Sequence, residues 1–162
     1  MKNETNTVNN RIGSSNGNGR SNSHNAAERL SVLSQAPAAK VKVLAEGLLD
    51  DLGAIDVIEN RTGLVMLPYT DSVQGITFHL GEVLIAEARV RLTDHDVEGY
   101  GSCLGRDLVQ ALALALLDAA LRAGISTAAI NTLADTCTVE LADADADLLR
   151  RVATTRVNME TF

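Results

Sequence analysis

The sequence predicts an α+β fold in which an antiparallel β-meander packs on a long buried apolar helix, with two N-terminal helices, a C-terminal helix and a terminal arm. Residues 84–92 alternate apolar and polar side chains with the two-residue period of a half-buried strand. From Leu108 the spacing becomes helical, and this helix is apolar on nearly every side. Trp is absent and aromatic residues make up 2% of the chain, so the core must consist of aliphatic side chains.

The chain divides by composition into a tail, residues 1–25, and a single α+β domain, residues 26–162. The tail is rich in Asn, Ser and Gly and has too little apolar surface to offset its ordering entropy, so it is predicted to be disordered. It does not contain the apolar core of a secretory signal peptide. The domain is long enough for one hydrophobic core.

Two helices are predicted at the start of the domain. Asn25 and Glu28 fit a capping pair for the first helix. Pro37 suits the first turn of the second helix, because its missing N–H would have had no partner there, and Gly53 supplies the stop. Two adjacent short helices also resemble a helix-turn-helix DNA reader. However, the second helix mixes Lys40 with acidic residues and lacks the basic face that contacts phosphates.

Five short strands joined by tight turns are predicted to follow as an antiparallel meander. A hairpin turn is expected at residues 60–63, which read Asn-Arg-Thr-Gly, a second turn is expected at Gly81, and Pro68 is expected to end the second strand. In the fourth strand, Arg89 and Arg91 lie on the polar side, which faces away from the core. The five expected strands are residues 55–59, 64–67, 76–80, 84–92 and 97–104.

The central helix is predicted to end at Gly124. Asp107 is expected at its start, where the carboxylate holds backbone N–H groups, while Arg106 reaches outward. Because the leucines of this helix circle its axis, we expect a second layer, from the terminal helices or from a partner, to cover the side away from the sheet. Asp143 is predicted to cap the last helix, and residues 156–162 form the terminal arm.

Several polar groups invite a functional interpretation, and each has a structural alternative. Asp143-Ala-Asp-Ala-Asp begins like a calcium-binding loop, but its sixth and twelfth positions lack the required Gly and Glu, so helix capping is favoured. The Asp residues on either side of His95 are placed to orient a general base, yet polar residues also collect at hairpin tips. His79 is expected on the surface. Cys103 and Cys137 fit no metal or redox spacing and are predicted to be free thiols, with Cys103 buried and inert.

The segment Gly99-Tyr100-Gly101, followed by Gly105, is similar to the glycine-rich loop of dinucleotide-binding proteins. The third glycine is one position late, the preceding strands are antiparallel, and Asp107 places a carboxylate where the pyrophosphate should sit. The structural alternative is that Gly99 and Gly101 let helix and sheet approach closely. A free-standing small nucleotide-binding protein or enzyme that uses the loop from Gly99 to Asp107 is the alternative function.

The overall charge excludes some classes of partner. The formal net charge of −7 at pH 7 opposes binding to nucleic acid or to an anionic membrane surface. No segment approaches the roughly 18 consecutive apolar residues of a membrane helix. Residue chemistry alone indicates no catalytic residue and no set of metal ligands. Free thiols suit a reducing compartment, so a cytoplasmic location is expected.

A set of short motifs extends across residues 30–162. They are Val90-Arg91-Leu92-Thr93-Asp94, Gly99-Tyr100 and Gly105-Arg106-Asp107 ahead of an Ala/Leu-rich helix, then Ser31-Val32-Leu33 with Pro37, Thr62-Gly63-Leu64-Val65, Phe78 with Gly81, and Arg156-Val157. Together these motifs resemble the G subunit of bacterial carbon–phosphorus lyase, the PhnG family. The terminal arm departs from the family pattern, because Asn158-Met159-Glu160 replaces an expected aromatic pair and the chain stops early, at Phe162.

The resemblance implies a role in organic phosphonate catabolism. Family members act with the H, I and L subunits in the transfer of ribose triphosphate from ATP to methylphosphonate. The J subunit, a radical iron–sulfur enzyme, later cleaves the carbon–phosphorus bond. The resemblance thus implies that this chain is a non-catalytic subunit without a cofactor of its own, and that ATP and the iron–sulfur cluster are used elsewhere in the complex. The I subunit is the expected main partner, with H and J.

Five residues are the candidates for contact with a partner subunit or with substrate: Arg89, Arg91, Arg106, Arg156 and Val157. The last two belong to the terminal arm, whose apolar side chains would stay in water unless the arm docks on a partner. The alternative is that the arm folds back onto its own sheet as an edge strand.

Overall fold

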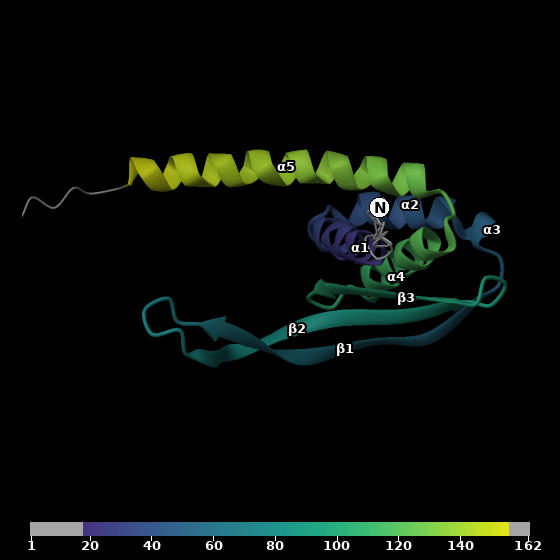
Figure 1. The fold of residues 1–162 in the computed structure, drawn as a ribbon, viewed down its shortest axis with the longest axis horizontal. Helices are drawn as coiled ribbons and strands as arrows, with labels where there is room; N and C mark the ends of the chain where they lie inside the picture. The colour runs from purple at the N-terminus through teal and green to yellow at the C-terminus, as the bar shows by residue number, and fades with distance from the viewer. Residues whose placement is uncertain (1–17, 156–162) are drawn as a thin grey trace, which may run out of the picture.

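A computed structural model describes the backbone of residues 18–155 and the side chains of residues 27–155. The sheet is antiparallel in the order β1-β2-β3, and helices cover one of its faces (Figure 1). The predicted α+β fold is confirmed. The elements follow in the order α1 (Asn18–Gln35), α2 (Ala38–Gly47), α3 (Leu49–Leu52), β1 (Ile55–Thr70), β2 (Thr77–Leu92), β3 (Val97–Leu104), α4 (Leu108–Ala123) and α5 (Thr127–Thr154).

The meander consists of three strands, two of them long, instead of the five short strands expected. Residues 60–63 lie inside β1, where Gly63 pairs with Ile85, so the turn predicted there is wrong. Gly81 likewise lies inside β2 instead of in a turn, and Pro68 does not end its strand. The turn-forming composition is overridden because β1 and β2 pair along nearly their whole length.

The chain reverses between β1 and β2 in a turn that starts at Asp71. Its carboxylate accepts hydrogen bonds from the backbone N–H groups of Val73 and Gln74. Gly75 then adopts a φ of 68°, a left-handed conformation that glycine tolerates at no steric cost. The long hairpin therefore has a single reversal, fixed by one Asp and one Gly.

The central helix α4 packs on the inner face of the sheet. Gly99 and Gly101 of β3 make this packing close, because a Cβ atom would lie 2.2 Å from the Ala115 carbonyl oxygen at Gly99 and 2.4 Å from the Ala115 nitrogen at Gly101. Only glycine permits this approach, so the structural interpretation of the two glycines is confirmed. Five alternating side chains of β2 were expected to face the core. Ala86, Ala88, Val90 and Leu92 are buried, and Leu84 is half-buried.

Helices α1 and α2 flank α4, and α5 lies across this layer on the side that faces away from the sheet (Figure 1). Ala113 and Leu117, on the side of α4 away from β3, are buried, which confirms the expected second layer and shows that the chain's own helices supply it. Leu108 and Val109 in the first turn of α4 stay exposed, so the expected burial of the helix applies only from Gln110 onward.

The N-terminal helices follow the prediction with one difference at their start. α1 begins at Asn18, ahead of the predicted start at Asn25. The second predicted helix is divided into α2 and α3, with Pro37 before α2 and Gly53, at a φ of 70°, ending α3. Residues 1–17 of the predicted tail lie outside the described residues.

The last helix, α5, is one continuous element, so Asp143 lies inside it and the cap predicted there is wrong. The Thr- and Ala-rich segment before Asp143 is helical because Ile130, Ala134 and Cys137 recur at three- and four-residue steps and are buried against the body. The terminal arm, residues 156–162, lies outside the described residues.

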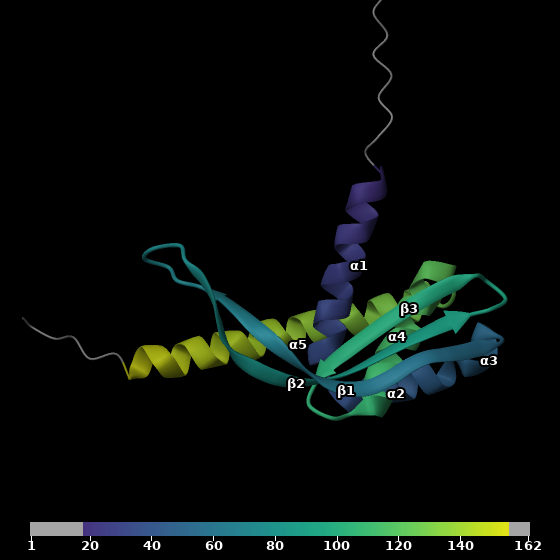
Figure 2. The same ribbon diagram turned by 90° about the horizontal axis from the view of Figure 1, so that it is seen from below.

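Two segments project from the body on the same side: the end of the β1–β2 hairpin and the C-terminal half of α5 (Figure 1 and Figure 2). β3 pairs with β2 only as far as the Ile85–Leu104 pair. Beyond that pair the hairpin is two-stranded, and helix α4 no longer covers it (Figure 1).

Candidate functional site

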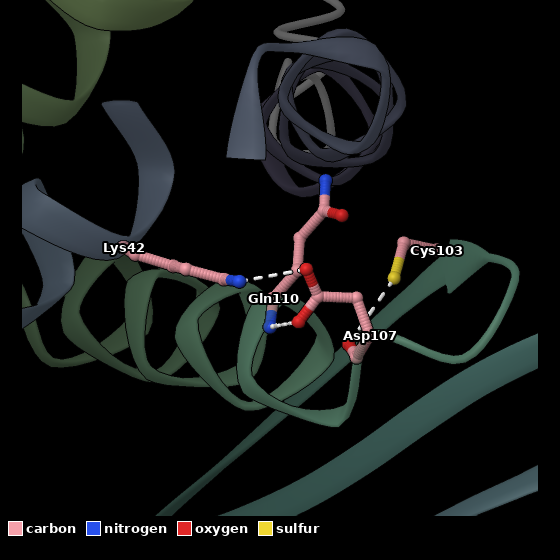
Figure 3. Close-up of polar contacts among 4 residues, drawn as sticks. All are labelled: Lys42, Cys103, Asp107 and Gln110. Atoms are coloured by element: carbon pink, nitrogen blue, oxygen red, sulfur yellow. Dashed lines mark hydrogen bonds and ion pairs between the residues drawn. The ribbon is translucent and has the colours of Figure 1, made fainter. Parts of the chain in front are cut away.

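Polar contacts gather at the N-terminus of α4, where Lys42, Cys103, Asp107 and Gln110 form what we call the Asp107 cluster (Figure 3). Asp107 caps the helix, because its Oδ1 accepts a hydrogen bond from the Gln110 backbone N–H at 2.9 Å. Its Oδ2 accepts a second hydrogen bond from Lys42 Nζ at 2.6 Å. The expectation that Asp107 holds backbone N–H groups at the helix start is confirmed.

The Lys42 ammonium and then the Gln110 N–H hold the pKa of Asp107 below its ordinary value. The side chains of Lys42 and Asp107 are 32% and 37% exposed, so solvent screens the pair and its contribution to stability is modest. Sequence analysis missed this pair. Lys42 comes from α2, 65 residues before Asp107, and no local pattern links the two.

Burial makes the two cysteine thiols poor nucleophiles. Cys103 Sγ lies 3.6 Å from the backbone oxygen of Asp107 (Figure 3), and burial raises the pKa of this thiol. Burial also raises the pKa of Cys137 on α5. A thiol must lose its proton to attack a substrate or bind a metal, so both side chains are held in the less reactive form. The prediction that both are free thiols is confirmed.

The glycine-rich segment does not have the form of a phosphate-binding loop. Gly99 and Gly101 lie within β3 and are packed against the backbone of α4. Gly105, with a φ of 96°, makes the turn into that helix. The Asp107 carboxylate already occupies the N-terminus of α4, where a phosphate would otherwise bind and where two negative charges would repel each other. This geometry disfavours a nucleotide site at the loop.

The outer face of the sheet, opposite the helices, carries a group of polar side chains that we call the charged sheet face. Arg61 Nε lies 2.7 Å from Glu87 Oε1, and the Tyr100 hydroxyl donates to Glu87 Oε2 at 3.1 Å. Arg91 forms an ion pair with Glu98 on β3. The members of the charged sheet face are Glu59, Arg61, Glu87, Arg89, Arg91, Glu98 and Tyr100.

These contacts leave one cation of the charged sheet face available. Arg61 holds the pKa of Glu87 below its usual value, and Arg91 does the same for Glu98. Arg89 lies between Glu59 and Tyr100 in the strand register, yet forms no ion pair within the part of the chain that the structure describes. Its exposed guanidinium can therefore bind an external carboxylate or phosphate without first breaking an internal ion pair.

The three predicted contact residues that the structure describes do not converge on one site. Arg89 and Arg91 lie together on the charged sheet face. Arg106 is exposed in the turn between β3 and α4, past the end of the β2–β3 pairing. Arg156 and Val157 lie outside the described residues.

Asp118 is a buried carboxylate that sequence analysis noted only as an interruption of the apolar helix. Its Oδ2 accepts hydrogen bonds from the Tyr100 backbone N–H at 3.0 Å and from Arg122 Nε at 2.9 Å. Its Oδ1 has no partner among the described residues. The carboxylate therefore ties β3 to α4. The sequence feature that could have indicated this role is an acid, Asp118, within an apolar helix and followed four residues later by Arg122.

Residues 27–155 contain no cluster of three His, Cys, Asp or Glu side chains that is arranged to hold a metal ion. Asp143, Asp145 and Asp147 lie on helix α5, so they do not form a calcium-binding loop. None of the helices in the described part of the chain combines the length and apolar character needed to cross a membrane.

Comparison with known proteins adds what the geometry does not supply. The family model described as phosphonate metabolism protein PhnG matches residues 25–162. A similar protein from Rhizobium meliloti (strain 1021) is named alpha-D-ribose 1-methylphosphonate 5-triphosphate synthase subunit PhnG. The two sequences are 28% identical over 135 residues, which cover 83% of this chain and 86% of the relative.

Proposed function

This chain belongs to the PhnG family of phosphonate metabolism proteins, and we propose on that basis that it is a subunit of the complex that makes α-D-ribose 1-methylphosphonate 5-triphosphate. The observation that carries the proposal is the extent of the family match, which starts at residue 25 and includes every described element except the first turns of α1. The similar Rhizobium protein bears the name of a subunit of that synthase.

Within such a complex we assign this chain a binding role in the transfer of ribose triphosphate from ATP to methylphosphonate. Two features support a non-catalytic role. Its cysteine thiols are buried with raised pKa values, and its glycine-rich segment is used for packing β3 on α4. Catalysis, ATP binding and the iron–sulfur chemistry that later cleaves the carbon–phosphorus bond then belong to other subunits. The proposed location is the cytoplasm.

The proposed partners are the I subunit foremost, with H, L and J. Arg89, Arg91 and Arg106 are exposed and are the proposed contacts on the described surface, together with Arg156 and Val157 of the terminal arm. Arg89 and Arg106 are better supported than Arg91, because both are exposed and neither forms an ion pair among the described residues, whereas Arg91 is paired with Glu98. A guanidinium in this state suits either a carboxylate of a partner or a phosphate of the substrate.

A genetic experiment tests this function. Deletion of the gene should abolish growth on methylphosphonate as the sole phosphorus source, and the wild-type chain should restore it. An affinity-tagged chain should bring down the I, H and J subunits from the restored cells. Unimpaired growth of the deletion strain, or purification of the tagged chain without any of these subunits, would contradict the proposal.

A further inference from the structure

The buried face of α5 continues beyond the body of the protein. Ile130 and Cys137 lie on this face and are buried. Leu148 follows Ile130 by 18 residues, about five turns at 3.6 residues per turn, so it lies on the same side of the helix. Yet Leu148 is 52% exposed. We call this continuation the α5 stripe; its members are Leu141, Ala144, Leu148 and Val152.

The helix-facing side of the sheet also continues beyond the body. Ala86 of β2 is buried against α4 and pairs with Thr62. Two residues further along each strand, Leu84 pairs with Leu64 on the same side of the sheet, and Leu64 is 64% exposed. We call this side the hairpin face; its members are Leu64, Met66, Glu82 and Leu84.

The α5 stripe and the hairpin face belong to two outer layers of the fold. The layer of helices between them ends before either outer layer does. In the body, α1, α2 and α4 lie between the sheet and α5 (Figure 1). The hairpin and α5 both extend past these helices on the same side in both views (Figure 1 and Figure 2). No other described element lies in the middle layer there. Apolar side chains on both outer layers are therefore left without the packing that the same faces have in the body.

We propose that a segment of another subunit of the same complex, apolar on two sides and carrying basic residues, lies between the α5 stripe and the hairpin face. There it continues the middle layer formed by α1, α2 and α4. This inference rests on the proposed function, since it requires the chain to be one subunit among several.

Charge identifies the kind of occupant. Among the described residues, Glu82 is the charged member of the hairpin face, and Asp145 is the acid at the edge of the α5 stripe. Arg151 lies at the opposite edge of the α5 stripe. Asp143 and Asp147 lie on other sides of the helix, and Asp147 pairs with Arg150. Glu82 and Asp145 thus place two acids against one cation, Arg151, on the two faces, so a segment that presents Lys or Arg to these two acids fits between them best. A second copy of this chain is a poor fit, because each copy carries a formal net charge of −7.

The chain's own ends are also poor fits for this position. Residues 1–17 are dominated by Asn, Ser, Gly and charged residues, with few apolar side chains to bury. Residues 156–162 offer three large apolar side chains, on Val157, Met159 and Phe162. Neither segment can cover both faces, which together expose side chains on two elements.

Copurification of the tagged full-length chain with the co-expressed I, H and J subunits tests the inference. Leu64→Lys and Leu148→Lys place a cation on each face. Their matched controls are Ile58→Lys, an exposed position on the same strand within the body, and Val139→Lys, about half a turn away from the buried side of α5. All four side chains are at least 44% exposed, so each isolated variant should keep the wild-type melting temperature.

Both face variants should weaken subunit binding by about 30-fold or more, as loss of a buried interface anchor typically does, and both controls should bind as wild type. Replacing Glu82 and Asp145 together with Lys should also weaken binding. Wild-type binding by the two face variants would overturn the inference and leave the proposed function intact. Failure of the wild-type chain to bind any subunit would overturn the proposed function as well.

A thiol probe distinguishes a segment of another subunit from two other possible occupants, the chain's own C-terminal residues and a second copy of the chain. In a Leu148→Cys variant the new thiol is exposed while Cys103 and Cys137 are buried, so maleimide should label it first. Labelling should be fast in the isolated chain and at least about tenfold slower in the complex. Slow labelling of the isolated chain overturns the inference in either of two ways. If labelling becomes faster when residues 156–162 are deleted, the occupant is the chain's own end. If labelling becomes faster on dilution, the occupant is a second copy of the chain.

Discussion

Lys42 and Asp107 join the second helix to the first turn of the central helix, with Lys42 Nζ 2.6 Å from Asp107 Oδ2. The same carboxylate caps α4 through the Gln110 N–H. One side chain therefore caps the central helix and also contacts the helix that packs against it. The pair connects residues that are 65 positions apart in the sequence.

Replacement of Asp107 should lower stability mainly through the lost cap. Asp107→Ala should reduce the free energy of unfolding by about 1–2 kcal/mol, measured by urea denaturation. Asp107→Asn should cost less, because an amide oxygen still accepts the Gln110 N–H. Lys42→Met, which removes the partly exposed ion pair and keeps the cap, should cost at most about 1 kcal/mol. A larger loss for Lys42→Met than for Asp107→Ala would show that the ion pair, and not the cap, is the main interaction.

The depressed pKa of Asp107 predicts a loss of stability in acid. A carboxylate whose folded pKa lies below its unfolded value stabilises the protein above the unfolded value, about 3.9 for Asp, and this contribution is lost as the pH falls through the folded pKa. The free energy of unfolding should therefore fall below about pH 4 less steeply in Asp107→Asn than in the wild type. Glu87 and Glu98 titrate in the same direction in both proteins, so the difference between the two curves isolates Asp107. Identical slopes would contradict the assignment.

The glycines of β3 should not tolerate a side chain. In Gly99→Ala the new Cβ would lie 2.2 Å from a backbone oxygen of α4, so the melting temperature should drop, corresponding to about 1–3 kcal/mol or more. Gly63→Ala is the matched control, because it lies in β1 with nothing within 4 Å of the added atom. Its stability should stay within about 0.5 kcal/mol of wild type. Equal melting temperatures for the two variants would show that α4 is not seated on β3 as described.

The buried Asp118 carboxylate should matter for stability. Asp118→Ala leaves the Tyr100 N–H without its partner, which should cost about 1–3 kcal/mol in urea unfolding. Asp135→Ala, an exposed acid on α5, serves as the control and should change stability by no more than about 0.5 kcal/mol. If the two substitutions have the same effect, Asp118 does not tie β3 to α4.

Local patterns in the sequence predicted most of the core. The alternation that ends at Leu92 and the apolar spacing after Leu108 gave the central strand and helix, and Asp107 was correctly placed as the cap. The predicted turn at residues 60–63 failed because strand pairing overrode turn-forming composition. The cap predicted at Asp143 failed because the buried stripe of α5 begins well before it.

The candidate site was less accessible to sequence reasoning, because its contacts join distant segments. Lys42 reaches Asp107 from another helix, and Tyr100 reaches Asp118 from another element. No local spacing encodes either contact. Arg89 and Arg91 were placed on the correct face of their strand, since two-residue alternation fixes the side on which each residue lies. What those arginines bind depends on partner chains, and the alternation of β2 carries no information about them.

Release of adenine from ATP in the presence of methylphosphonate is the most direct test of the central claim, that this chain is a non-catalytic subunit of the synthase. The purified complex should release adenine, the complex lacking this chain should release much less, and adding the purified chain back should restore the rate. The chain alone should release none. Adenine release by the isolated chain, or full activity of the complex without it, would contradict the account.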